Sequence, residues 1–370
     1  MKILFIVPYP IGEAPSQRFR FEQYFNSLSN KGHTYHISSF LNTHNWRLFY
    51  KSGYPINKTF ALMQGFATRM LDCFKALRYD FIFIHREGSP IGPPFFEWIL
   101  TKLLQKKIIY DFDDAIWLTD KLDEGRLEKL LRWRSKVSSI CKWSYRISCG
   151  NAYLADYARQ FNNNVIINPT TIDTELVHNP EKLKKITDHV GSNLQLTEKT
   201  SLVIGWTGSH STLKYLKSLE EVLIKIELKY EQVSFIVIAD RKPEMMLKRL
   251  NFVQWNKDSE AADLFKLDIG IMPLPDDEWT KGKCGFKALQ YMALGIPPVA
   301  SPIGVNTTII QHGVNGYLAK TNVEWLHALT ELIEQKELRE KLGKEAIKTV
   351  ENHYSVNANK ERFLNLFNQH

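Results

Sequence analysis

The stretch KGKCGFKALQYMALGIPPVAS, residues 281–301, decides the fold. A glycine-containing loop opens a helix, Gly295 ends that helix, and residues 298–301 form a buried strand. The following residues, Pro302-Ile-Gly304-Val-Asn306, make a second turn of small residues. A loop, a helix and a strand in immediate succession are typical of an α/β domain with a parallel sheet.

The pattern around this stretch extends through the second half of the chain. Runs rich in β-branched and aromatic residues occupy residues 202–206, 234–239, 252–255, 268–272, 298–301 and 316–319, with helical segments between them. Parallel neighbours need a crossover connection, so strands that alternate with helices predict a doubly wound parallel sheet.

The first half repeats the same alternation. Its strand-like runs are residues 2–7, 33–40, 81–85, 107–110, 146–149 and 165–167. One intervening helix is predicted over residues 17–30, where Phe21, Tyr24, Phe25 and Leu28 share a face. The apolar run at 2–7 is too short for a signal peptide and has no cleavage site, so it is interpreted as the first strand.

Two Rossmann-like domains in tandem therefore account for the chain. We expect an N-terminal domain over residues 1–170, a C-terminal domain over 171–355 and a helix over 356–370 that packs back on the N-terminal domain. The chain passes between domains within residues 168–199, which are rich in Pro, Asn, Thr and charge. Ligands are expected in an interdomain cleft at the carboxyl ends of the strands.

Composition narrows the class of protein. The 370 residues exceed what one hydrophobic core usually organises, and their 44% hydrophobic and 24% charged content is that of a globular chain without a bilayer-spanning segment. The four cysteines form no C-x-x-C pair and have no histidine at zinc spacing, which predicts a reducing cytoplasm. The net charge of +8 favours anionic partners: nucleic acid, phosphorylated small molecules or an acidic membrane surface.

Two loops of the second half are suited to a diphosphate. Lys283 and Lys287 stand at the start of the helix after Gly285, where free amides and the helix dipole favour an anion. The alternative is a solvated basic helix start. The first strand of this half leads into a second loop, in which backbone amides can approach a phosphate. Its candidate donor contacts are Gly208, Ser209, His210 and Lys214, and Gly304 of the later turn is a further candidate. The alternative for the second loop is a plain βα connection.

Several runs of residues resemble a known family. They are Asp268-Ile-Gly-Ile-Met-Pro-Leu-Pro, Lys283-Cys-Gly-Phe-Lys287, Gln290-Tyr-Met-Ala, Gly313-Val-Asn-Gly316, Ser16-Gln-Arg18-Phe-Arg20 and Tyr110-Asp-Phe-Asp-Asp-Ala-Ile-Trp117. Together they span nearly the whole chain and resemble the bacterial glycosyltransferases of group one, family four. The resemblance implies the GT-B fold, a nucleoside diphosphate sugar as donor, a hydroxyl acceptor, retention of configuration and no metal or other cofactor. It also implies a place in lipopolysaccharide, capsule or other surface-glycan assembly.

One departure from the family keeps other functions open. The family's Glu-x7-Glu pair falls here on Gly282 and Gln290. Gln290 can hydrogen-bond a ribose hydroxyl but carries no charge, so Lys287 takes over part of the donor contact. A catalytically silent subunit that binds sugar nucleotides is the alternative from another class, and a GT-B epimerase of nucleotide sugars is the alternative enzyme.

The first half supplies the acceptor side. Asp111-Phe-Asp113-Asp114 follows a strand, and its D-x-D pattern is also the metal signature of the other major glycosyltransferase fold, which lacks a second nucleotide-binding domain like this one. We therefore expect Asp113 or Asp114 to orient or deprotonate an acceptor hydroxyl, or else to cap a helix near Ala115. The resemblance places the first βα loop, with Gly12, Arg18 and Arg20, on the acceptor side. Glu87, which follows another strand at the same edge, is a further candidate acceptor contact. At most one of the two arginines is expected to face the cleft.

Residues 126–146 mix basic with apolar and aromatic side chains on a predicted helix. Such a helix suits an anionic membrane surface or an electrostatic nucleic-acid contact, but a solvated helix packed on the sheet has the same pattern. The expected partners are a nucleotide-sugar donor and a glycan or lipid-linked acceptor, without nucleic acid. The expected place is the cytoplasm, with peripheral contact to the inner face of the membrane left open.

Overall fold

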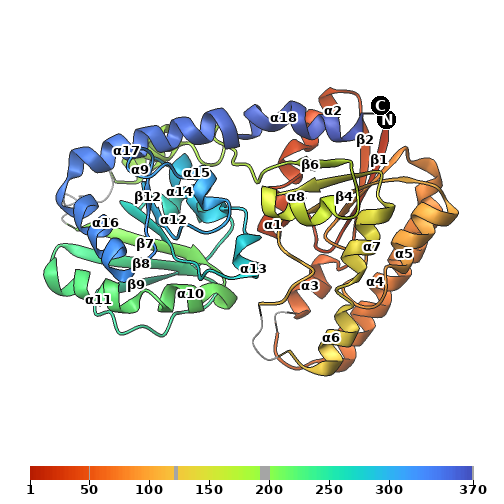
Figure 1. Ribbon diagram of the computed structural model, residues 1–370, viewed down its shortest axis with the longest axis horizontal. Helices are drawn as coiled ribbons and strands as arrows, with labels where there is room; N and C mark the ends of the chain where they lie inside the picture. The colour runs from red at the N-terminus through yellow and green to blue at the C-terminus, as the bar shows by residue number, and fades with distance from the viewer. Residues whose placement is uncertain (50, 121–123, 192–200, 369–370) are drawn as a thin grey trace. The chain divides into compact units, whose positions relative to one another are not determined.

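A computed structural model describes residues 1–49, 51–120, 124–191 and 201–368. The chain forms two compact units. Unit 1 contains Met1–Thr170, Lys281–Cys284 and Asn359–His370, and unit 2 contains Thr171–Thr280 and Gly285–Ala358 (Figure 1). Residues 192–199 of the predicted passage between domains lie outside the described residues.

Unit 1 is built on a six-stranded sheet in which every pair of neighbours is parallel. Its strands are β1 (Lys2–Val7), β2 (Thr34–Ser39), β3 (Phe81–His85), β4 (Lys107–Phe112), β5 (Arg146–Cys149) and β6 (Val165–Ile167). The spatial order β2-β1-β3-β4-β5-β6 reverses its direction between β1 and β3. Loops leave the two strands toward opposite faces at such a switch point, which is where doubly wound sheets bind ligands.

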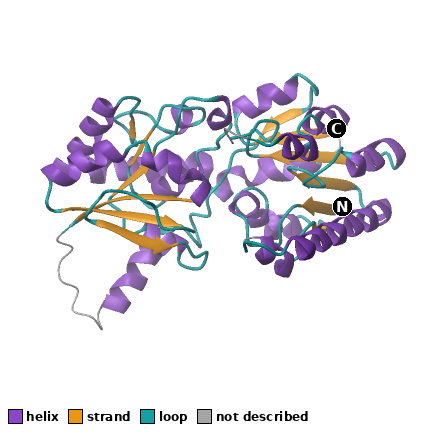
Figure 2. Ribbon diagram, turned by 90° about the horizontal axis from the view of Figure 1, so that it is seen from below, coloured by secondary structure: helices purple, strands orange, loops and turns teal. Residues whose placement is uncertain are grey.

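Helices cover both faces of this sheet (Figure 2). They are α1 (Pro15–Arg18), α2 (Phe25–Asn30), α3 (Thr43–Phe49), α4 (Pro55–Lys75), α5 (Phe95–Trp98), α6 (Arg126–Arg132), α7 (Lys136–Trp143) and α8 (Ala152–Arg159). The single helix predicted over residues 17–30 is wrong. Helix α1 ends at Arg18 and a 3₁₀ turn, Glu22–Tyr24, precedes α2, because Arg20 turns inward to bond Asp111.

The core of unit 1 includes the end of the chain. Phe5 and Phe83 lie side by side on β1 and β3, with ring centroids 4.9 Å apart. Helix α18 (Val356–Leu364) stacks its Phe363 on Tyr24 at 4.4 Å. The Arg146 guanidinium donates to the carbonyl oxygens of Asn365 and Leu366 at 2.7 Å. Aromatic burial and carbonyl capture together hold the last residues of the chain in this unit.

Unit 2 has a second six-stranded parallel sheet. Its strands are β7 (Leu202–Gly208), β8 (Val233–Ala239), β9 (Leu250–Gln254), β10 (Ile269–Met272), β11 (Pro298–Ala300) and β12 (Tyr317–Leu318). The order β12-β11-β10-β7-β8-β9 reverses between β7 and β10 and has the connectivity of dinucleotide-binding sheets. Two doubly wound parallel sheets, as predicted, are confirmed.

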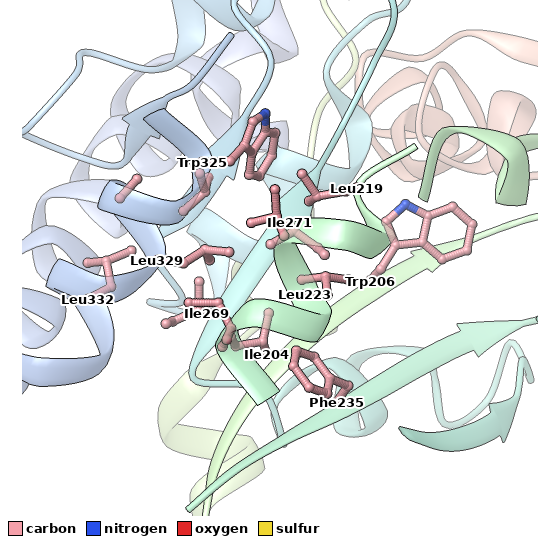
Figure 3. Packing of buried hydrophobic residues seen from close by; sticks show 14 of the residues in the cluster. Ile204, Trp206, Leu219, Leu223, Phe235, Ile269, Ile271, Trp325, Leu329 and Leu332 are labelled. Atoms are coloured by element: carbon pink, nitrogen blue, oxygen red, sulfur yellow. The ribbon is translucent and has the colours of Figure 1, made fainter. Parts of the chain in front are cut away.

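The helices of unit 2 again lie on both faces of its sheet (Figure 2). They are α9 (Pro180–Gly191), α10 (Leu213–Lys217), α11 (Glu220–Lys229), α12 (Glu260–Leu264), α13 (Glu278–Lys281), α14 (Phe286–Ala293), α15 (Asn306–Ile309), α16 (Asn322–Glu334) and α17 (Lys336–Thr349). Figure 3 shows one of the two apolar layers, in which Leu223 of α11 and Leu329 of α16 meet the strand residues Ile204 and Ile269.

The contact of α17 with the end of α14 requires a glycine. A Cβ atom at Gly343 would overlap with the carbonyl oxygen of Gly295, which is backbone and has little freedom to move. Gly125 lies in an open loop by contrast, because a Cβ atom added there would have no neighbour within 4 Å.

We predict that Gly343→Ala lowers the free energy of unfolding by about 1–3 kcal/mol, because an added methyl group forces the two segments apart. Gly125→Ala is the matched control and should leave the unfolding midpoint within error. Both are measured by urea unfolding followed by circular dichroism. An unchanged midpoint for Gly343→Ala would contradict the tight crossing.

Candidate active site

A buried carboxylate organises the carboxyl ends of the strands in unit 1. Asp111, on β4, accepts hydrogen bonds from Arg20, from His85 Nδ1 at 2.8 Å and from the Ser148 hydroxyl at 2.6 Å. Arg20 also donates to the carbonyl oxygen of Asn168. At most 1% of any of these side chains is exposed. Asp111 therefore ties β3, β4 and β5 to the first βα loop.

The charges around Asp111 decide its ionisation. Burial alone would raise the pKa of this carboxyl, but the charge of Arg20 and the bond from His85 outweigh it and hold the pKa well below the usual range. Asp111 is thus an anion at neutral pH, and its partners are cationic or hydrogen-bonding groups that require it to be one.

The next two aspartates share one arginine. Arg86 Nε donates to Asp113 Oδ1 at 3.0 Å, and its Nη2 atom donates to Asp114 Oδ2 at 2.7 Å. The Asp113 and Asp114 side chains are 12% and 17% exposed. No helix follows at Ala115, since residues 116–117 form a turn. The helix-capping alternative for these aspartates is therefore wrong.

Arg86 adopts a backbone conformation that is unusual for its type. Its φ is +61°, in the left-handed region that favours glycine. Two hydrogen bonds hold it there: its amide donates to the Asp111 carbonyl at 2.7 Å, and its own carbonyl accepts from the Tyr110 hydroxyl at 2.6 Å. A strained residue held in this way at a strand end indicates a functional position.

The segment Lys281–Cys284 belongs to unit 1 and meets the acidic pair. Lys283 Nζ donates to Asp114 Oδ1 at 2.9 Å, and the Cys284 thiol donates to the Asp113 carbonyl at 3.1 Å. The Asn151 amide donates to the carbonyl oxygens of Gly282 and Lys283 at 3.1 and 3.0 Å. Lys283, predicted as a donor contact, thus lies with the predicted catalytic pair.

This cationic environment sets the chemistry of the pair. Burial would raise the pKa of Asp114, but Lys283 and Arg86 lower it below its usual value, so Asp114 is a weak proton acceptor. Among the residues that the structure describes, no three His, Cys, Asp or Glu side chains gather to hold a metal.

The predicted acceptor contacts occupy different environments. Gly12 has φ +78° and donates its amide to Glu22 at 2.8 Å. Arg18 is half-buried and lies over the Phe19 ring at 4.9 Å. Arg20 is bonded to Asp111, and Glu87 pairs with Lys136 at 2.7 Å. Arg18 is thus the arginine of the pair with exposed surface, and the acceptor role of all four residues stays a prediction.

Unit 2 brings the predicted donor loops to its switch point. Strand β7 ends at Gly208, two residues beyond the predicted end, and leads to Ser209 and His210. The His210 ring nitrogen Nδ1 lies 2.6 Å from the Asp240 carboxylate at the end of β8. Lys214, one turn later, places its ammonium 5.3 Å from the Tyr215 ring.

Helix α14 reaches the same edge from β10. The Tyr291 hydroxyl accepts from the Thr207 amide at 3.0 Å and lies 3.4 Å from the Ile271 carbonyl, so it bridges β7 and β10 where they diverge. Lys287, in the first turn of α14, lies over the Trp206 ring at 5.0 Å. Gly304 follows β11 with φ +53°. The predicted donor residues of unit 2 therefore gather on the loops at the carboxyl ends of β7, β10 and β11.

Gln290 faces the interior of unit 2. Its amide nitrogen donates to Glu260 at 3.1 Å and lies 3.2 Å from His178 Nε2, and 1% of the residue is exposed. A carboxylate at position 290 would face Glu260 as a like charge, which explains why an amide fits here. Its donor contact stays a prediction.

The sequence interpretation missed several residues that the structure brings together. Arg86, Asn151, Asp240 and Glu260 were not proposed, because each is defined by a partner far along the chain. One feature of the sequence could have indicated Arg86. It follows β3, the strand next to the one that carries the aspartates, and the ends of neighbouring parallel strands lie close together.

The comparisons with known proteins agree with this architecture. Residues 199–349 match the family model of glycosyl transferases group 1. The match covers most of unit 2. The family resemblance predicted from the sequence is confirmed there. A search of curated proteins by sequence finds no match.

Solved structures extend the likeness to the whole chain. HepE of Anabaena, in complex with UDP and glucose, superposes with a TM-score of 0.65 at 14% identity over 98% of both chains. A glycosyltransferase from Rickettsia africae gives 0.69 at 15% identity over 99% of this chain and 97% of its own. WaaG, a glycosyltransferase involved in lipopolysaccharide biosynthesis, gives 0.64 at 11% identity over 100% of both. The predicted GT-B fold is confirmed.

Asp111→Asn should destabilise unit 1 by about 3–5 kcal/mol, because the Arg20 charge would be left buried and uncompensated. The matched control is Asp156→Asn, which breaks a surface pair whose side chains are 71% and 48% exposed and should change stability by less than about 1 kcal/mol. Urea unfolding measures both.

The stability difference between wild type and Asp111→Asn should depend on pH. The folded pKa of Asp111 lies below its unfolded value, so its contribution is present above the unfolded pKa of about 3.9 and is lost as the pH falls below it. The difference between wild type and Asp111→Asn should therefore shrink below about pH 4. A constant difference down to pH 2 would contradict this account.

Proposed function

We propose that the protein transfers a sugar from a nucleoside diphosphate sugar, specifically a UDP-sugar, to a hydroxyl acceptor with retention of configuration. The observation that carries the proposal is the group 1 family match over residues 199–349, which includes every predicted donor loop of unit 2. The complex of HepE with UDP and glucose makes uridine the first base to test.

Positive charge in unit 2 supports the proposed binding of the donor diphosphate. The α14 N-terminus and the loop after β7 present backbone amides at the switch point, where a diphosphate is stabilised by the partial positive charge of helix ends. Lys287 adds a full charge in the first turn of α14, a position that opposes the helix dipole unless an anion is present. Charge grows on the diphosphate as the sugar departs, so these contacts strengthen in the transition state.

The acceptor side rests on Asp113. Both carboxylate oxygens of Asp114 are bonded, to Arg86 and Lys283, and its pKa is lowered. Asp113 is bonded to Arg86 through Oδ1, and among the described residues no hydrogen bond engages its Oδ2 atom. We therefore assign Asp113 to the acceptor hydroxyl, which it orients for attack on the oxocarbenium-like carbon and whose proton it accepts. Asp114 holds Arg86 and Lys283 in place.

The wider role belongs to the same proposal. The acceptor is a glycan or lipid-linked glycan, and the reaction is a step in bacterial surface polysaccharide or glycolipid assembly in the cytoplasm. The support is general: the likeness to WaaG, which acts in lipopolysaccharide biosynthesis, extends over the full length of both chains.

Donor binding gives the first test. UDP at a hundred times its dissociation constant should stabilise the folded protein by about 2.7 kcal/mol, read as a rise in melting temperature. Lys287→Ala should melt at or above the wild-type temperature without ligand yet lose much of the UDP-induced rise, because a charge-assisted bond to phosphate contributes roughly 1.5–3 kcal/mol. Lys344→Ala, on the exposed side of α17, is the control. If Lys287→Ala keeps the full UDP shift, Lys214 and the loop after Gly208 become the phosphate site.

Catalysis gives the second test. Asp113→Asn should lower sugar transfer or UDP-sugar hydrolysis roughly a hundredfold or more while leaving the UDP-induced melting shift intact. Asp114→Asn should lower activity less, since it removes a positioning charge. Equal activity of wild type and Asp113→Asn would show that another group accepts the proton. UDP binding without any turnover by wild type would favour the silent-subunit alternative, and release of an epimerised UDP-sugar would favour the epimerase.

A further inference from the structure

Helix α4 of unit 1 buries charged side chains and exposes apolar ones. Its charged residues Arg69 and Asp72 are 1% and 0% exposed, while Phe60 and Phe74 on the opposite side are 69% and 68% exposed. A helix that borders water normally turns its apolar side chains to the core and its charges outward. The pattern of α4 calls for an apolar partner outside the described chain.

The orientation of α4 is fixed by its buried side. Arg69 pairs with Asp72 at 2.8 Å and donates to the carbonyl oxygens of Val7 and Gly88, each at 2.7 Å, at the ends of β1 and of the loop after β3. Gly65 packs against the Phe40 ring so closely that a Cβ atom would overlap with it. Rotating the helix to hide its apolar side would break all of these contacts.

The exposed side forms a continuous stripe, which we call the α4 stripe. Most of its members are three, four or seven residues apart along the helix and the turn that follows it: Ile56, Phe60, Met63, Met70, Leu71, Phe74 and Leu77, between 41% and 82% exposed. Helix α5 extends the apolar surface with Phe95 and Trp98, which are 49% and 40% exposed. The two helices are joined by Phe66 and Phe96, whose ring centroids are 6.0 Å apart.

The charges beside the stripe are mostly basic, with Asp80 as an exposed carboxylate just beyond it. Over residues 51–78 the exposed charged side chains include Lys51, Lys75 and Arg78, and the one acidic residue is the buried Asp72. The acidic Glu97 of α5 is only 1% exposed, and the basic Lys102 after α5 is exposed. An apolar stripe flanked by lysine and arginine complements a surface of acyl chains beneath anionic headgroups.

We infer that the α4 stripe docks unit 1 on an anionic lipid bilayer, with α4 lying in the plane of the membrane surface. None of the helices in the described part of the chain is long and apolar enough to cross a bilayer, so the stripe lies on the membrane. A second copy of the stripe would bring lysines and arginines of the same sign together, which disfavours self-association. The inference is independent of sugar transfer and of the donor site in unit 2.

The same structure changes the earlier expectation for residues 126–146. The single helix predicted there is wrong: α6 ends at Arg132, Trp133 has φ +48°, and α7 begins at Lys136. Lys136 is buried against Glu87, and Arg134 binds the Leu118 carbonyl, so neither charge is available to a membrane. Helix α6 still exposes Leu127 and Leu130, at 69% and 63%. It is a short addition to the longer stripe of α4.

Vesicle co-sedimentation of the full chain tests the inference. Wild type should sediment with vesicles of phosphatidylcholine and phosphatidylglycerol, and less with phosphatidylcholine alone or at high salt, where the Debye length falls to roughly 3 Å. The double variant Phe60→Ser, Phe74→Ser should partition about tenfold or more less to the mixed vesicles. The matched control is Leu228→Ser, Met246→Ser, whose parent side chains are 76% and 77% exposed on unit 2.

Charge and assembly variants complete the experiment. Lys75→Gln with Arg78→Gln should weaken binding to anionic vesicles and leave binding to neutral ones unchanged. All variants change exposed side chains and should melt within a few degrees of wild type, which separates lost docking from lost folding. The inference is overturned if wild type ignores both kinds of vesicle or if the Phe60 and Phe74 variant binds like wild type. It is also overturned if light scattering shows a dimer that this variant converts to a monomer.

Discussion

The ion pair between Asp111 and Arg20 is the contact on which the candidate site depends. It lies in the interior of unit 1, and its partners reach it from β3, β5, the first βα loop and the carbonyl of Asn168. A buried carboxylate is stable only when its charge and lone pairs are matched, so these elements have one arrangement that satisfies it. Asp113 and Asp114 follow within three residues on the same strand end. Their placement is therefore as rigid as the buried pair.

Two arginines divide the acidic segment between them. The buried Arg20 pairs with Asp111, and the partly exposed Arg86 pairs with Asp113 and Asp114. Three carboxylates so close together in the sequence would repel one another without this division. The strained backbone of Arg86 is the local cost of bringing its guanidinium to both aspartates.

The sequence predicted the strands more reliably than the helices, for a physical reason. Buried parallel strands are short and apolar on both faces, so β1, β3, β5 and β6 fall on the predicted residues. The helix over residues 17–30 has the correct apolar spacing, yet Arg20 interrupts it, because its partner Asp111 lies far along the chain. Long-range pairing also removed Arg20 from the exposed residues of the acceptor loop. Local periodicity cannot reveal either effect.

Periodicity also cannot tell which side of a helix faces inward. The apolar spacing of the α4 stripe is typical of a helix side that packs on the core. The structure exposes the stripe, because the opposite side carries Arg69 and Asp72, and Arg69 binds the carbonyl oxygens of Val7 and Gly88. This surface belongs to unit 1, the unit that carries Asp113. Docking through the stripe would therefore hold that unit at the bilayer surface.

The contact between Gln290 and Glu260 has a consequence for substitutions at position 290. The Gln290 amide nitrogen and the Glu260 carboxylate lie 3.1 Å apart in the interior, where two carboxylates must share a proton and an amide beside a carboxylate need not. A Gln290→Glu substitution would therefore place a second acid beside the one already present at position 260.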